Sequence, residues 1–180
     1  MISKIKTITI TLGVLLSTQI FASGSHNKMD HSKMKMKQGS RKMLMGAQKK
    51  EVLAVLQANE KLQESFFKYD GASAQKAAMN VKMAMSKVSK PEIAKLLKYA
   101  QTKLGELKSS NSRDQNNKIY HMVSSAMILV VKRYDVGGKY NAYSCPMAKK
   151  KWIQNSAKND GVKNPYLAMM PGCGSKDTTY

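Results

Sequence analysis

Acidic residues are scarce in this chain of 180 residues: 11 Asp and Glu stand against 31 Lys and Arg, which gives a net charge of +20. The few carboxylates form no dense cluster, and this argues against a Ca²⁺ or Mg²⁺ site. A basic protein attracts anionic surfaces. The Lys residues are nevertheless spread along every segment without an aromatic-basic module, so we expect no nucleic-acid binding.

Catalytic motifs are also missing. The sequence contains no Ser/His/Asp set, no carboxylate pair and no Gly-rich phosphate loop, so we predict that the protein is not an enzyme. No apolar run reaches the length that a membrane-spanning helix needs. The sequence therefore indicates a binding protein without a membrane span.

The start of the chain has the organisation of a secretory signal. Lys4 and Lys6 form a charged beginning, residues 8–16 form a short apolar run, and small residues surround Ala22. We predict cleavage after Ala22, so that residues 1–22 are a signal peptide. No Cys directly follows the apolar run, so a lipoprotein anchor is not expected. The mature protein is predicted to be periplasmic or secreted.

Residues 23–45 are polar and Lys-rich and have no helical apolar periodicity, which predicts a disordered tail. Methionine in a globular domain fills gaps in the core, but a disordered tail has no core. Thioether and imidazole groups together suit copper, so we predict auxiliary metal capture by His26, Met29, His31, Met34 and Met36. Two other interpretations remain open: sacrificial methionines that scavenge oxidant, and low-complexity drift.

Four segments carry apolar residues at the helical period and are joined by short polar turns. They cover residues 48–68, 73–88, 90–107 and 113–134. Capping boxes are predicted at Ser89 and Ser112. Because no strand pattern competes, we predict an all-α fold, an up-down four-helix bundle over residues 46–135. Met79 and Met83 are expected to pack in that bundle.

Residues 136–180 contain both cysteines, the single tryptophan and three of the four prolines. We predict a loop-rich, sulfur-containing segment that packs on the bundle, with Trp152 as its packing anchor. A short helix around this residue, over 147–156, is also expected. Cysteine and methionine sulfur select Cu(I) over hard cations.

Two interpretations of the cysteines remain open. In the first, a Cys145–Cys173 disulfide closes a long loop and stabilises the fold by about 3 kcal/mol. In the second, sulfur atoms bind one metal ion, and the candidate ligands are Cys145, Met147, Met169, Met170 and Cys173. His121, on the fourth predicted helix, is a boundary residue, or a further ligand if the C-terminal loops fold back over that helix.

The C-terminal motifs resemble a known family. They are Tyr143-x-Cys145-Pro146-Met147, Trp152-x-Gln154, Asn164-Pro165-Tyr166 and Met169/Met170 followed by Cys173-Gly174. The set is similar to a bacterial periplasmic domain family of unknown function, found alone in exported proteins or fused to adaptors of copper/silver-type heavy-metal efflux systems. The resemblance implies a helical bundle followed by a metal site formed by Cys145, Met147, Cys173 and one of the two methionines.

Together these observations predict a periplasmic copper-binding protein that captures or hands over Cu(I), or Ag(I), in heavy-metal tolerance, with a heavy-metal efflux adaptor as a partner. The alternative is a basic helical interaction module that is stapled by the disulfide and docks an acidic partner or an efflux adaptor. Titration of thiols in natively purified protein discriminates between the two, because only the metal-binding form has both thiols free.

Overall fold

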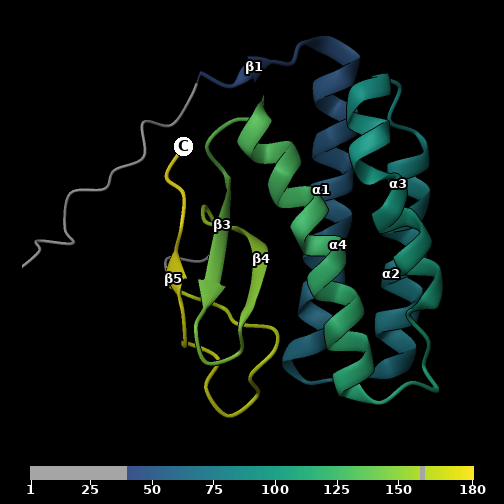
Figure 1. Cartoon of the computed structure of the whole chain (residues 1–180), viewed down its shortest axis with the longest axis vertical. Helices are drawn as coiled ribbons and strands as arrows, with labels where there is room; N and C mark the ends of the chain where they lie inside the picture. The colour runs from purple at the N-terminus through teal and green to yellow at the C-terminus, as the bar shows by residue number, and fades with distance from the viewer. Residues whose placement is uncertain (1–39, 159–160) are drawn as a thin grey trace, which may run out of the picture. The chain divides into compact units, whose positions relative to one another are not determined.

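The computed structural model describes residues 40–158 and 161–180, which form four helices and five strands (Figure 1). In chain order these are β1 (Lys42–Met43), α1 (Gly46–Phe67), α2 (Gly71–Ser86), α3 (Pro91–Glu106), α4 (Arg113–Arg133), β2 (Tyr134–Asp135), β3 (Tyr140–Cys145), β4 (Lys150–Asn155) and β5 (Ser175–Lys176). The predicted signal peptide, residues 1–22, lies outside the described residues, as do the auxiliary capture residues His26, Met29, His31, Met34 and Met36.

The prediction of an all-α fold is wrong. All four predicted helices occur, each within two residues of its expected ends, but strands accompany them and the fold is mixed α/β. β1 pairs with β2 in parallel, and β3 is the central strand of an antiparallel sheet with the order β4-β3-β5. The helix expected at residues 147–156 is replaced by β4 and the turn before it.

The first described residues also correct the boundary of the predicted tail, residues 23–45. Lys42 and Met43 form β1, and the Leu44 side chain is buried in the core. Arg41 forms an ion pair with Asp135 at 3.1 Å, and its guanidinium lies 3.8 Å from the centroid of the Tyr180 ring. The ordered domain therefore begins before α1.

Local capping explains two of the helix starts. The predicted capping box of α4 is confirmed, because the Ser112 hydroxyl accepts from the Gln115 amide while the Gln115 side chain accepts from the Ser112 amide. Asp70 caps α2 by accepting from two amides of its first turn. The capping box predicted at Ser89 is wrong: its amide and hydroxyl both donate to Glu51 on α1, at 2.8 Å each.

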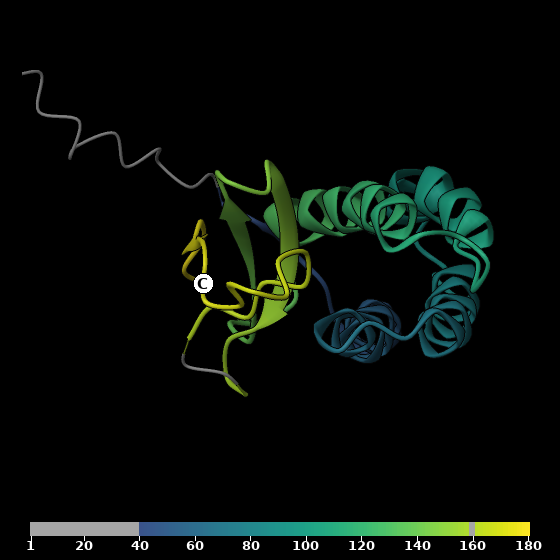
Figure 2. The same cartoon turned by 90° about the horizontal axis from the view of Figure 1, so that it is seen from below.

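The helices pack in the order of the sequence, α1 on α2, α2 on α3 and α3 on α4. The three-stranded sheet packs mainly on α4, and β4 also contacts α1. Both views place α2 and α3 on the side of the helices away from this sheet (Figures 1 and 2). The sheet therefore completes the fold on the side where α1 and α4 face it.

A row of aromatic rings joins the helices to the sheet. Neighbouring centroids are 4.8, 5.7, 6.1 and 5.8 Å apart along the series Phe66, Tyr120, Tyr166, Trp152 and Tyr143. Trp152 is fully buried in this row, as expected of a packing anchor. Aromatic pairs at such distances add about 0.5–1.5 kcal/mol each beyond their burial, so the row fixes the sheet against α4.

Glu60 provides a polar connection between α1 and the β3–β4 hairpin. Its carboxylate accepts hydrogen bonds from the Tyr140 hydroxyl at 2.5 Å, the Asn155 amide at 2.9 Å and the Lys158 ammonium at 2.5 Å. Burial alone would raise the pKa of Glu60, but these three hydrogen bonds outweigh it and hold the pKa below its usual value.

Among the described residues, no helix combines the length and the apolar character that crossing a membrane requires.

Candidate functional site

Cys145 ends β3 and begins the turn of the β3–β4 hairpin. It pairs with Lys150, and residues 146–149 form the connection. Pro146 accepts from the Lys149 amide at 3.2 Å, and Lys149 takes a φ of +51° to complete the turn. The Ala148 amide donates to the Cys145 sulfur at 3.4 Å. The turn therefore holds the sulfur of a buried cysteine with a backbone donor.

Cys173 lies on a loop that is organised by the buried side chain of Asn164. The Asn164 side-chain amide donates to the Cys173 carbonyl at 2.8 Å, and its backbone amide donates to the Pro171 carbonyl at 2.7 Å. The Cys173 amide closes a turn onto the Met170 carbonyl at 3.0 Å. These bonds set the direction in which the Cys173 thiol leaves the loop.

Gly174 lets this loop approach the sheet closely. Its φ is +131°, a conformation that L side chains rarely adopt. A Cβ atom at this position would lie 2.5 Å from the Ser144 carbonyl oxygen and 2.9 Å from the Trp152 ring. Only glycine therefore brings the preceding cysteine beside the end of β3, where β5 then adds to the sheet.

The two sulfur atoms meet at 2.6 Å, although 28 residues separate the cysteines in the chain. The structure places no bond between them, and Cys145 is buried while Cys173 is partly exposed. A disulfide bond measures about 2.05 Å, whereas two sulfurs on one tetrahedral ion, with bonds of about 2.3 Å, lie about 3.8 Å apart. A small displacement of the Cys173 loop therefore suffices for either outcome.

The surroundings shift the pKa values of the two thiols in opposite directions. Burial raises the pKa of Cys145, but hydrogen bonds from Cys173, the Ala148 and Met147 amides and Asn164 outweigh it and leave this pKa below its ordinary value. The pKa of Cys173 is raised, first because Cys173 hydrogen-bonds to Cys145, then by burial and by the neighbouring charge. The first proton to leave the pair therefore comes from Cys145.

A basic pocket of about 550 Å³ opens beside Cys145. Besides that cysteine, it is lined by His121, Ser125, Ser144, Pro146, Lys149, Lys150 and Lys151. Within residues 40–158 and 161–180, none of these three lysines forms an ion pair. The Lys150 ammonium donates to the Ala148 carbonyl at 3.4 Å. The lining of this pocket therefore carries positive charge and no carboxylate.

The C-terminal segment folds back over α4, as the ligand role of His121 requires. The His121 Nδ1 atom accepts a hydrogen bond from the Lys151 amide at 3.1 Å, and Tyr166 donates to the carbonyl of the same lysine at 2.9 Å. The same Nδ1 atom lies 3.4 Å from the Lys151 carbonyl oxygen, so its role as acceptor or donor depends on the tautomer. In this arrangement His121 positions β4 through its Nδ1 atom.

The three candidate methionines are exposed, and Met147 and Met170 lie two and three positions from a cysteine in the chain. The exposed fraction is 67% for Met147, 92% for Met169 and 42% for Met170. Across the described part of the chain, no group of three or more His, Cys, Asp and Glu side chains is arranged to hold a metal ion. No His, Asp or Glu side chain among the described residues therefore joins the two cysteines in a group of three.

Sequence reasoning missed the residues that position this site. Asn164 and Gly174 belong to the motifs of residues 136–180, but no positioning role could be predicted for them from the sequence. The sequence also offered no reason to place Lys149–Lys151 in a pocket beside Cys145. The Asn-Pro dipeptide was a usable signal, because Asn side chains commonly bond to the backbone two residues on, as Asn164 does with the Tyr166 amide at 2.9 Å.

Comparison of the chain with protein-family models, curated proteins and solved structures finds no match.

Proposed function

We propose that the protein binds Cu(I), and by the same chemistry Ag(I), through Cys145 and Cys173 in their reduced state. The observation that carries this proposal is the convergence of the two thiols, which come from the β3–β4 hairpin and from a loop 28 residues later. Thiolate sulfur is the ligand that Cu(I) prefers. The ion is cargo that the protein captures or hands over in heavy-metal tolerance.

The electrostatics of the site support this function. Two thiolates and one Cu(I) ion carry a combined charge of −1, and the lysines of the pocket beside Cys145 favour such an anion. The hydrogen bond from the Ala148 amide to the Cys145 sulfur also favours the deprotonated form. A highly basic protein can therefore hold this cation, because the ligands bring more negative charge than the ion brings positive charge.

A thioether completes the proposed coordination, from at least one of Met147, Met169 and Met170. Met170 precedes Cys173 in the same turn and is the least exposed of the three. Binding draws a flexible side chain onto the ion, so the loops are expected to become more ordered. We propose that the protein acts in the periplasm or outside the cell and that an efflux adaptor is the partner in handover.

Anaerobic titration of the reduced protein with Cu(I), Ag(I) and Zn(II), against a chromogenic competitor, tests the proposal. We expect one tight Cu(I) site, which Cys145→Ser abolishes. Met147→Leu, similar in volume, should weaken the site and leave the fold intact. If Cys145→Ser instead lowers the melting temperature without changing the Cu(I) affinity, the metal function is wrong.

The second candidate function is the stapled interaction module. The 2.6 Å separation of the sulfur atoms favours it, because thiols so close need little movement to form a disulfide. Thiol titration of protein purified without reductant decides between the two. Two reactive thiols support metal binding, whereas none, together with recovery of two after reduction, supports the staple.

A further inference from the structure

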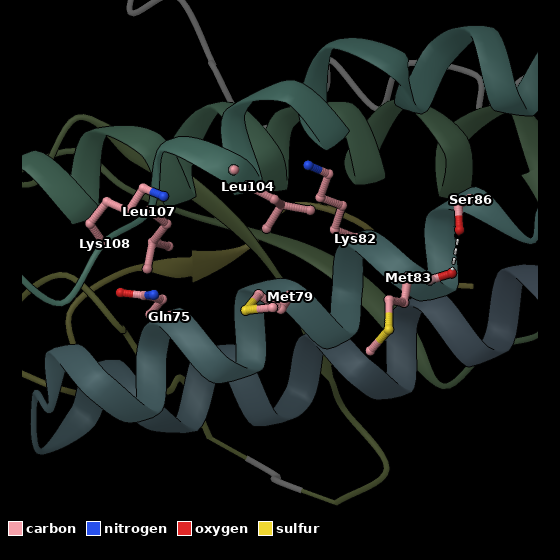
Figure 3. A pocket seen from close by; sticks show the side chains of 9 residues that line it. Gln75, Met79, Lys82, Met83, Ser86, Leu104, Leu107 and Lys108 are labelled. Carbon is pink, nitrogen blue, oxygen red and sulfur yellow. Dashed lines mark hydrogen bonds between the residues drawn. The ribbon is translucent and has the colours of Figure 1, made fainter.

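A second concave surface is lined by residues of α2, of α3 and of the turn after α3 (Figure 3). Figure 1 places these two helices on the side away from the sheet. This groove has a volume of about 400 Å³. Its lining consists of Gln75, Met79, Lys82, Met83, Ser86, Leu104, Gly105, Leu107 and Lys108, and we call it the Met-Lys groove. It shares no residue with the pocket beside Cys145.

The floor of the Met-Lys groove is apolar and adaptable. Met79 and Met83 stand on α2, and the facing lining residues are Leu104 of α3 and Leu107, which directly follows that helix (Figure 3). Their exposed fractions are 58% and 56%, so the prediction that they pack in the bundle is wrong. Residues four apart lie on one face of a helix. Exposed methionines are typical of surfaces that bind other helices, because the unbranched side chain adapts to its partner.

Gly105 and the hydrogen bond between Gln75 and Ser109 border the groove. The Lys82 ammonium lies 3.3 Å from the position that a Cβ on Gly105 would take, so a side chain at this position would crowd the lysine. At one end, Gln75 accepts a hydrogen bond from the Ser109 amide at 2.7 Å and ties α2 to the end of α3. The Lys82 side chain therefore reaches across the groove to Gly105, and the Gln75 bond fixes α2 against the turn that follows α3.

The charge of the groove is of one sign. Lys82 and Lys108 line it, and no Asp or Glu does. Within the described ranges neither lysine forms an ion pair. The α2 sequence contains no acidic residue at all. An occupant that presents apolar side chains to the floor and carboxylates to the rim matches both properties.

We infer that the Met-Lys groove binds an acidic amphipathic helix of a partner protein. A helix laid in an apolar trough between two helices is a recurrent mode of recognition. The chain's own residues 23–45 do not suit the site, because they carry six Lys and Arg against one Asp. A metal ion does not suit it either, because Lys82 places a positive charge beside the two thioethers. This surface is independent of the proposed copper site.

The test uses the full chain and a synthetic helical peptide with Leu at positions i, i+3, i+4 and i+7 and Glu elsewhere. A second peptide replaces every Glu with Lys. We expect the acidic peptide to bind, with shifts confined to the Met79 and Met83 methyl signals among the labelled methionines. Lys82→Glu should weaken binding at least tenfold, whereas Lys132→Glu on α4, the same change of charge outside the groove, should not. Met79→Gln with Met83→Gln should also weaken it.

Three results would overturn the inference. Equal losses for Lys82→Glu and Lys132→Glu would mean general charge attraction. Binding of the basic peptide as tightly as the acidic one would remove the charge argument. Association with anionic lipid vesicles, but not with the acidic peptide, would make the groove a membrane contact. Circular dichroism verifies the fold of each variant, and unchanged Cu(I) titration of Lys82→Glu separates this result from that of the thiol site.

Discussion

Cys145 and Cys173 lie in different surroundings, and this difference determines how the two thiols lose their protons. One thiol lies in a hairpin turn that supplies backbone donors, and the other lies on a partly exposed loop with no such support described. Deprotonating the first places a charge next to the second, so the two protons leave as a coupled pair.

We predict that the thiolate absorbance of the reduced protein rises in two steps as the pH increases. The first step lies below the ordinary cysteine value of about 8.5, because the pKa of Cys145 is lowered, and the second lies above it, because the pKa of Cys173 is raised. Cys173→Ser should leave one step, which shows the Cys145 thiol alone. A single two-proton step in the unmodified protein would contradict this assignment.

A second single residue, Gly174, is predicted not to tolerate a side chain. Gly174→Ala places a Cβ against the Ser144 carbonyl and the Trp152 ring, at a positive φ. We expect a loss of about 2–4 kcal/mol in the free energy of unfolding and weaker Cu(I) binding. Gly172→Ala is the matched control, because a Cβ there meets no atom within 4 Å. Equal melting temperatures for the two variants would contradict the close approach.

At the scale of the elements, the helices were predictable and the strands were not. An apolar period of 3.6 residues marks each helix, since each has one face on the core. β3 shows no alternation, because its residues are buried almost throughout, with α4 packed on the sheet and β4 and β5 paired along its two edges. A strand buried at nearly every position loses the period of two by which a strand is recognised.

The meeting of the two cysteines was predictable from the sequence, but the geometry that brings them together was not. The spacing of Cys145 and Cys173 indicates a pair, but whether the sulfur atoms meet depends on β5 pairing with β3 and on Gly174. The hydrogen bond from the Lys151 amide to the His121 ring joins segments 30 positions apart, and no local sequence pattern predicts it. Contacts between distant segments follow from tertiary packing, which periodicity does not encode.

Glu60 gives a prediction about how the elements are joined. Its folded-state pKa is lowered, so its contribution to stability is complete above the unfolded value of about 4.3 and is lost as the pH falls through the lower folded value. Glu60→Gln should therefore cost about 2 kcal/mol at neutral pH, and the difference from the unmodified protein should shrink below about pH 4. Chemical denaturation at several pH values measures this.

The control for this prediction is Glu64→Gln. Glu64 is exposed, and its one ion pair among the described residues is with the exposed Lys61, at 2.9 Å. Exposed pairs contribute little, so this variant should change the free energy of unfolding by less than about 0.5 kcal/mol. A pH-independent difference between Glu60→Gln and the unmodified protein would show that the carboxylate charge is not what joins α1 to the hairpin.

For the whole molecule, truncation separates the domain from the segment before it. Removing the residues between the signal and residue 39 should lower the number of bound copper ions and leave one tight ion, because the thiol site lies entirely within the ordered domain. Extending the removal to residue 45 also deletes β1, the buried Leu44 and the Arg41 ion pair. We expect that step to cost about 3 kcal/mol of stability. Loss of all copper binding in the shorter truncation would contradict independent sites.

The separations along the chain between contacting residues also set an order of events in time. Cys145 and Cys173 lie 28 positions apart, whereas Lys42 of β1 pairs with Tyr134 of β2 across 92 positions and Asn155 bonds to Glu60 across 95. Contacts between near neighbours form first, because they close shorter loops. The two sulfur atoms are therefore expected to meet before β1 and α1 close onto the rest of the domain. During refolding under oxidising conditions we expect a Cys145–Cys173 disulfide to appear before the domain is complete.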